Sequence, residues 1–121
     1  MKLKTFNPAI VTRNAEAVIA FNERVYDFKV IHKTENYLGT TDVEYVLENP
    51  DGFRLDVIYV KDQAVDCHAM RVNVDDFEAA LEEYKKEGFR IFAGPETDEH
   101  SKRVLIGRED NARVLLMQHL K

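Results

Sequence analysis

Apolar residues recur at spacings of three and four along residues 76–92, a pattern that predicts a helix followed by a strand. The apolar stripe consists of Phe77, Ala80, Leu81 and Tyr84. Asp75 or Asp76 can cap this helix, because a carboxylate oxygen accepts from a free backbone N–H of the first turn. With Asp75 as the cap, Glu78 takes the capping-box position. Gly88 can adopt the left-handed conformation that ends a helix.

The same order of features occurs earlier in the chain, in residues 12–31. There Asn14 stands where Asp76 stands later, and Asp27 stands where Gly88 does. Aspartate tolerates the left-handed conformation better than most residues, so Asp27 can also end a helix. The two segments lie about 60 residues apart, which indicates a repeated unit.

A third segment repeats at nearly the same spacing, since residues 51–58 correspond to residues 110–117. Three segments in one order indicate two copies of a unit of about 60 residues. We expect a single domain over residues 1–121, with one copy in about residues 1–62 and the other in about residues 66–121.

Short apolar runs bounded by turn-forming residues predict the strands of each copy. In the first copy they are Pro8–Thr12, Phe28–Thr34, Val43–Glu48 and Phe53–Val60, and in the second Cys67–Val74, Arg90–Ala93, Arg103–Ile106 and Arg113–Leu120. Each copy is therefore βαβββ, which places the chain in the α+β class. We expect residues 94–102 to form a loop, mobile from 97 to 102, and residues 108–112 to turn the last hairpin.

Alternation along two of these strands separates polar from apolar side chains. In the strand that starts the second copy, Arg71 and Asn73 face away from the apolar set formed by Met70, Val72 and Val74. In the strand that ends the first copy, Arg54 and Asp56 face away from Phe53, Leu55, Val57 and Tyr59. The apolar sets should lie against the helices, so the polar sets should face water or a cavity.

Composition excludes several classes of protein. The chain is 45% hydrophobic and 32% charged, which is typical of a globular domain, and its net charge of −5 argues against nucleic-acid binding. No apolar run is long enough to cross a bilayer, and the N-terminus lacks the apolar segment of a signal peptide. Cys67 is the single cysteine, which rules out an internal disulfide. These features favour the cytoplasm, with no membrane partner.

The duplicated unit resembles the vicinal oxygen chelate superfamily, which includes glyoxalase I, bleomycin-resistance proteins and extradiol dioxygenases. The resemblance rests on the order of the elements, on Asn49-Pro-Asp-Gly52 before a strand, and on Val74-Asp-Asp-Phe-Glu-Ala-Ala-Leu81 at a helix start. It covers essentially the whole chain. It implies two tandem βαβββ modules that form curved mixed sheets around a small-molecule cleft, and it implies a homodimer.

The resemblance also implies four metal-ligand positions, two on the first strands and two on the last strands. Here they fall on Asn7, Ala69, Asp56 and Leu115. Ala69 and Leu115 have no donor atom, and only Asp56 is a natural ligand, so we expect no metal cofactor. In the alternative, a register shift of one residue would pair His68 with Asp56 around a divalent ion, against the alternation of that strand.

The sequence therefore predicts a metal-independent small-molecule binding protein, with the ligand in the cleft between the two modules. The candidate ligand contacts are Asn7, Arg54, Asp56, Arg71 and Asn73, and no catalytic residue is assigned. A salt bridge from Asp56 to Arg71 or Arg54 explains the same residues equally well. The alternative function is a metal-dependent lyase, isomerase or dioxygenase of the same superfamily, and a third is a degenerate module that serves dimerisation or regulation.

Overall fold

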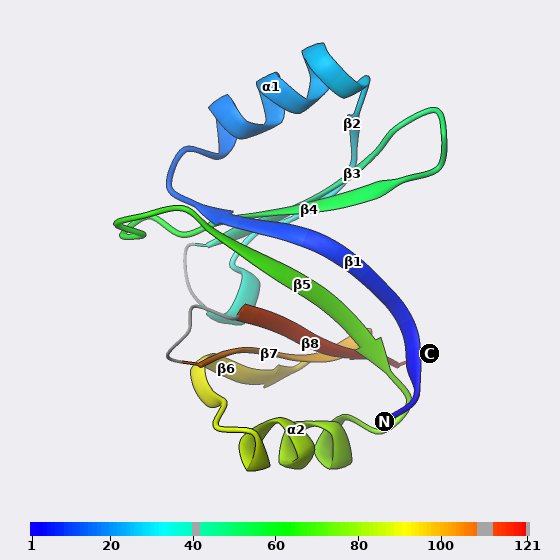
Figure 1. The fold of residues 1–121 in the computed structure, drawn as a ribbon, viewed down its shortest axis with the longest axis vertical. Helices are drawn as coiled ribbons and strands as arrows, with labels where there is room; N and C mark the ends of the chain where they lie inside the picture. Colours follow the sequence, from blue (N-terminus) through cyan, green and yellow to red (C-terminus); the bar gives the residue numbers. More distant parts are fainter. Residues whose placement is uncertain (40–41, 109–112, 121) are drawn as a thin grey trace. The chain divides into compact units, whose positions relative to one another are not determined.

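Each predicted copy folds as a strand, a helix and three further strands, which confirms the α+β class and the βαβββ order (Figure 1). The structure is a computed structural model and describes residues 1–39, 42–108 and 113–120. The first copy contains β1 (Leu3–Thr12), α1 (Ala15–Tyr26), β2 (Lys29–Thr34), a short 3-10 turn η1 (Tyr37–Gly39), β3 (Val43–Glu48) and β4 (Arg54–Tyr59). The second contains β5 (Cys67–Val74), α2 (Phe77–Lys86), β6 (Arg90–Thr97), β7 (Ser101–Gly107) and β8 (Arg113–His119).

The chain divides into two compact units that nearly match the two copies. The first unit is Asn7–His68, and the second unit is Met1–Phe6 together with Ala69–Lys121. In the first unit the strands lie in the order β2-β3-β4-β1, and in the second in the order β6-β7-β8-β5. In both, the first strand of the copy runs parallel to its last strand, with Ala9 beside Asp56 and Arg71 beside Leu115.

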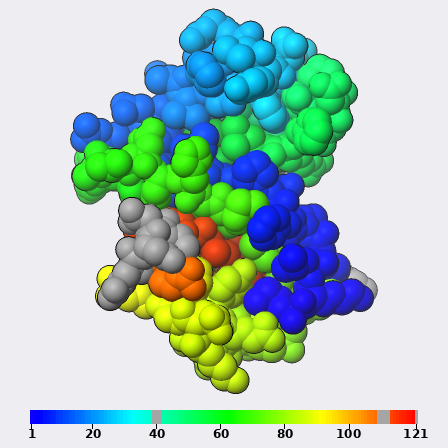
Figure 2. Space-filling model, in the orientation of Figure 1, coloured from blue at the N-terminus to red at the C-terminus, as the bar shows by residue number. Residues whose placement is uncertain are grey.

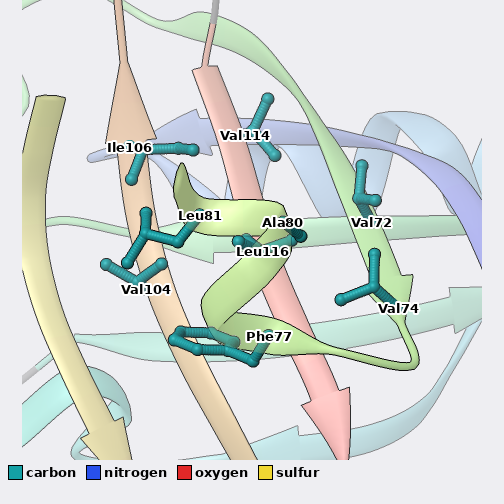
Figure 3. Packing of buried hydrophobic residues seen from close by; sticks show 9 residues of the cluster. All are labelled: Val72, Val74, Phe77, Ala80, Leu81, Val104, Ile106, Val114 and Leu116. Carbon is teal, nitrogen blue, oxygen red and sulfur yellow. The ribbon is translucent and has the colours of Figure 1, made fainter. Parts of the chain in front are cut away.

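The core of the second unit lies between α2 and one face of its sheet (Figure 3). Helix residues Phe77, Ala80 and Leu81 are buried, as the apolar stripe predicts. They pack on the alternate strand residues Val72, Val74, Val104, Ile106, Val114 and Leu116. The helix ends as predicted, because Gly88 has a φ of +91° and the Phe89 ring folds back to 5.0 Å from that of Tyr84.

The N-terminal cap of α2 is Asp76, whose side chain accepts from the backbone N–H of Ala79 at 3.1 Å. Ala79 is therefore the third helical residue, so Asp76 is confirmed as one of the two predicted caps, and the capping box that Asp75 would have formed with Glu78 is not the one used. Glu78 instead accepts from the Lys102 Nζ on β7 at 2.7 Å. The cap satisfies one of the backbone donors that every helix start leaves without an intrahelical partner.

The first unit repeats this plan with a looser helix. Leu47, Leu55 and Val57 are buried on the face of the sheet that carries α1, with Ala15 against them. Asp27 ends the helix in the left-handed conformation, with a φ of 61°. However, Asn14 at the helix start makes no side-chain cap hydrogen bond, and Phe21 on α1 is 47% exposed.

Two further expectations are corrected by the structure. Phe53 is not on the covered face of β4, because the turn continues through it: the Asn49 side chain accepts from the Phe53 N–H at 3.0 Å, and Phe53 is 68% exposed. The loop expected at residues 94–102 is mostly strand, since Thr97 pairs with Lys102 across the β6–β7 hairpin. The turn expected at residues 108–112 lies almost entirely outside the described residues.

No helix in the described ranges is long and apolar enough to span a membrane.

The two helix starts form a matched pair for measuring the cap. Asp76→Ala removes a side-chain acceptor from the N–H of Ala79, so we expect a loss of about 1 kcal/mol in the free energy of unfolding. Asn14→Ala removes no such bond, so its loss should be much smaller. Urea unfolding followed by circular dichroism measures both, and equal losses would contradict the assigned caps.

Candidate functional site

The candidate site residues lie on the sheet face that the helices leave uncovered. In the second unit, Leu116 and Val72 pack with α2, so Arg71 and Asn73 on β5 point to the opposite face. In the first unit, Leu55 and Val57 pack with α1, so Asp56 points away from that helix. The alternation predicted for both strands is confirmed, apart from Phe53.

Arg71 is a buried cation of this face with two described side-chain contacts. It is 9% exposed, its Nε donates to the Met117 Sδ at 3.2 Å, and its Nη2 lies 3.4 Å from the His119 Nε2. Asn73 supports the same arrangement, because its Oδ1 accepts from the backbone N–H of His119 at 3.3 Å. The guanidinium is thus held in one orientation, which favours planar recognition of a carboxylate or carbonyl group.

His119 is kept neutral by its surroundings. Burial lowers the pKa of its imidazole, and the positive charges of Arg71 and Lys4 lower that pKa further. A neutral ring can accept from the Arg71 guanidinium through Nε2, whereas a protonated ring would repel it. The pair is therefore compatible at neutral pH, and the face carries one fixed positive charge at this point instead of two.

A second buried arginine follows on β7. Arg103 is 8% exposed, and its Nη1 donates to the Asp98 Oδ2 at 2.8 Å and to the Ser101 Oγ at 3.0 Å. The hydrogen bond from Arg103 is the largest cause that lowers the pKa of Asp98 to about 2, and the backbone N–H groups of His100 and Ser101 add to it. The side chain of Asp98 therefore ties the β6–β7 turn to Arg103.

The corresponding face of the first unit is acidic. Asp56 has no exposed surface, and Glu44 on β3 is 3% exposed. Asp56 lies beside Val46 and Glu44 beside Ile58, so the two carboxylates are diagonal neighbours on adjacent strands. Glu44 was missed by the sequence analysis, although the signal was present: it alternates with Val43 and Tyr45 in the same way that Asp56 alternates with its apolar neighbours.

The other two predicted contacts are less enclosed. Arg54 forms an ion pair with Glu48, with its Nε 3.3 Å from the Glu48 Oε2, and its side chain is 47% exposed. Asn7 is half-buried on β1, two residues before Ala9, which is Asp56's partner in the sheet. The first unit therefore places Asn7, Asp56 and Arg54 along one face, and the second unit places Arg71 and Asn73 along another.

The residues present do not fit the divalent ion that the superfamily resemblance implies. At the four expected positions, Ala69 and Leu115 are buried alkyl side chains, 5% and 0% exposed, with no donor atom. Within the part of the chain that the structure describes, no three or more His, Cys, Asp or Glu side chains lie close enough to share an ion. His68, the alternative ligand, lines a hollow with α1 residues, whereas Asp56 points away from α1.

Solved structures with a similar fold were found, although no protein-family model and no curated protein matches the chain. Methylmalonyl-CoA epimerase of Streptomyces coelicolor, in complex with 2-nitronate-propionyl-CoA, is 19% identical, with a TM-score of 0.67 over 97% of this chain and 98% of that chain. The Mycobacterium tuberculosis epimerase is 13% identical, with a TM-score of 0.68 over 96% of this chain and 88% of that chain.

A third similar structure is a glyoxalase/bleomycin resistance protein/dioxygenase superfamily member from Vibrio splendidus 12B01. It is 12% identical, with a TM-score of 0.63 over 98% of this chain and 100% of that chain. At these identities the likeness concerns the fold, and the near-complete coverage of both chains shows that the whole βαβββ duplication is shared.

Asp98 makes stability depend on pH in a defined direction. Its pKa is about 2 in the folded chain, below the ordinary 3.8, so it contributes stability above about pH 4 that is lost as the pH falls toward 2. Between these values the urea midpoint of the wild type should fall more steeply than that of Asp98→Asn. Asp62→Asn, which removes an exposed carboxylate that has no bond to Arg103, should keep the wild-type slope. Equal slopes for the wild type and Asp98→Asn would contradict the role of this ion pair.

Proposed function

Because the chain has a fold of the vicinal oxygen chelate type, we propose that it binds a small molecule without a metal ion, as a binding protein of the glyoxalase/bleomycin-resistance kind. The observation that carries the proposal is the replacement of two of the four expected metal ligands by the buried alkyl groups of Ala69 and Leu115. A buried arginine stands two residues from Ala69 on the same face of β5. The polar anchor is thus Arg71 and not a cation held by carboxylates.

Arg71 and Asn73 define the class of ligand. The Arg71 guanidinium, which contacts Met117 and His119, is a planar charged group whose geometry matches a carboxylate or a carbonyl oxygen. We assign this recognition to Arg71, with Asn73 beside it. Asn7, Asp56 and Arg54 complete the proposed contacts, with Asp56 supplying negative charge or accepting a proton. The structures of similar fold that hold methylmalonyl-CoA or 2-nitronate-propionyl-CoA support an acyl-CoA or a small carboxylic acid as the first ligands to test.

The same similarity favours a second candidate, an enzyme. Two of the three similar structures described above carry the name of an epimerase, so a metal-dependent isomerase or lyase remains the alternative, with a dioxygenase behind it. Incubating the chain with methylmalonyl-CoA in deuterium oxide separates the two. Exchange of the hydrogen on the carbon between the two carbonyl groups that is faster than in a protein-free sample would show catalysis, and binding without faster exchange would support the first proposal. The predicted homodimer stays a prediction.

Arg71→Lys tests the anchor. Lysine keeps the charge but cannot form the two parallel hydrogen bonds, so we expect the affinity for methylmalonyl-CoA to fall by about ten-fold. The affinity for propionyl-CoA, which lacks the carboxylate, should change little. Isothermal titration calorimetry measures both ligands, and a thermal melt verifies that the variant folds.

Arg90→Lys is the matched control, because Arg90 is an exposed arginine on β6. It should leave both affinities unchanged. Equal affinity of wild type and Arg71→Lys for methylmalonyl-CoA would contradict the role of Arg71, as would equal losses for the two ligands.

Metal content gives an independent test. Protein purified without chelator should contain Ni, Zn, Fe and Mn well below one ion per chain, and dialysis against EDTA should leave the ligand affinity unchanged. Elemental analysis by mass spectrometry measures the first, and calorimetry the second. Near-stoichiometric metal that is lost together with ligand affinity would overturn metal-independent binding.

A further inference from the structure

A hollow of about 480 Å³ lies beside α1, entirely within the first unit. Its walls come from α1, β1 and the segment that leads into β5, and its lining residues are Ile10, Asn14, Ala17, Val18, Phe21, Asn22, Asp66 and His68. The volume is that of a small-molecule pocket. We call this the α1 groove.

The floor of the α1 groove carries a buried polar side chain. Asn22 is 7% exposed and interrupts the apolar stripe of α1. Its Nδ2 donates to the Val18 carbonyl at 2.9 Å. Its Oδ1 accepts no hydrogen bond from any residue in the described ranges and is not among the fully enclosed atoms that lack a partner. The Oδ1 therefore keeps some accessible surface, and because Asn22 lines the groove this oxygen is an available acceptor for a ligand there.

The apolar wall is formed by side chains that α1 does not bury. Phe21 is 47% exposed, and Val18 and Ile10 are half-buried around it. The small side chain of Ala17 leaves space beside them. By contrast, Phe77, Ala80 and Leu81 of α2 are buried in their sheet. Atoms of α1, in blue to light blue, are at the molecular surface in Figure 2. The exposed part of Phe21 leaves this wall accessible to a ligand.

The charge of the lining defines what the groove can hold. Asp66 is its acid, no lysine or arginine is among the lining residues, and Asp66 is exposed without an ion pair to any described residue. A second hollow of about 470 Å³, which shares Asn14 and Ala17 with the α1 groove, is lined by both Arg13 and Glu16. The α1 groove has an acid and no arginine or lysine in its lining, so it is the one that favours a cation.

We propose that the α1 groove binds an organic ammonium ion with an apolar body. The ammonium group lies near the Asp66 carboxylate and the Asn22 Oδ1, which are acceptors for its N–H groups. The apolar body covers Val18 and the Phe21 ring, whose face also attracts a cation. This second ligand site needs neither Arg71 nor Asn73, so it goes beyond the proposed function and can fail or hold independently of it.

The test uses phenethylammonium as the probe and 2-phenylethanol as its uncharged match. In a titration followed by ¹H–¹⁵N NMR, phenethylammonium should shift the amide signals of residues 17–22 and 66–68 in a saturable way. The alcohol should shift the same signals with a lower affinity. Asp66→Asn should lower the affinity for the ammonium by about two- to five-fold, which is the range of an exposed ion pair. It should leave the affinity for the alcohol unchanged. Asp62→Asn removes a nearby exposed carboxylate that does not line the groove, so it should change neither affinity.

The apolar wall has its own matched pair. Phe21→Ala should lower the affinity for both probes. Phe53→Ala, which removes a more exposed ring outside the groove, should change neither affinity. The proposal is overturned if no saturable shift appears at residues 17–22 and 66–68 up to the solubility limit of the probe. It is also overturned if the two probes bind alike, or if Asp66→Asn has no more effect than Asp62→Asn.

Discussion

The period of two along a strand is the constraint on which both units depend, because each sheet has one helix to cover it. In each unit the helix packs on alternate apolar residues of the strands, and the strand residues between them point to the other face. Several charged residues on that second face are also buried, so they cannot be ordinary solvated groups. Arg71, Asp56 and Glu44 are each at most 9% exposed, and charged groups so enclosed need defined partners.

Much of this arrangement could be predicted from residues alone. β3 and β5 have the predicted bounds, and the polar and apolar faces of β5 separate as the alternation requires. The predictions that failed concern turn geometry and strand pairing, which the alternation of polar and apolar residues does not determine. Phe53 is lost from β4 because Asn49 holds the turn one residue longer, and residues 94–97 became strand through pairing with β7. Pairing is a tertiary property, and turn formers such as Gly94 and Pro95 do not reveal it.

The sequence predicts which face of the sheet carries the candidate site, but it does not predict the contacts that the site residues make. The direction of Arg71 follows from its neighbours in the strand, whereas its contacts with Met117 and His119 join residues 46 and 48 positions away. Glu44 was visible in the pattern and was overlooked because β3 was not analysed by faces. The α1 groove could not be foreseen, because its lining joins α1 and β1 to Asp66 and His68, more than 40 residues further along the chain, and spacing in a sequence does not show such contacts.

One strand has a consequence for the history of this chain. Leu3–Phe6 of β1 are counted with the second unit, while Asn7–Thr12 of the same strand belong to the first. The N-terminal amine of Met1 also lies 3.5 Å from Glu83 on α2. A gene fragment cut at the seam between the duplicated halves would therefore encode residues 69–121 without a segment that they contact. The duplication is readable in the order of elements, yet the compact unit that contains the second copy also includes residues from the start of the chain.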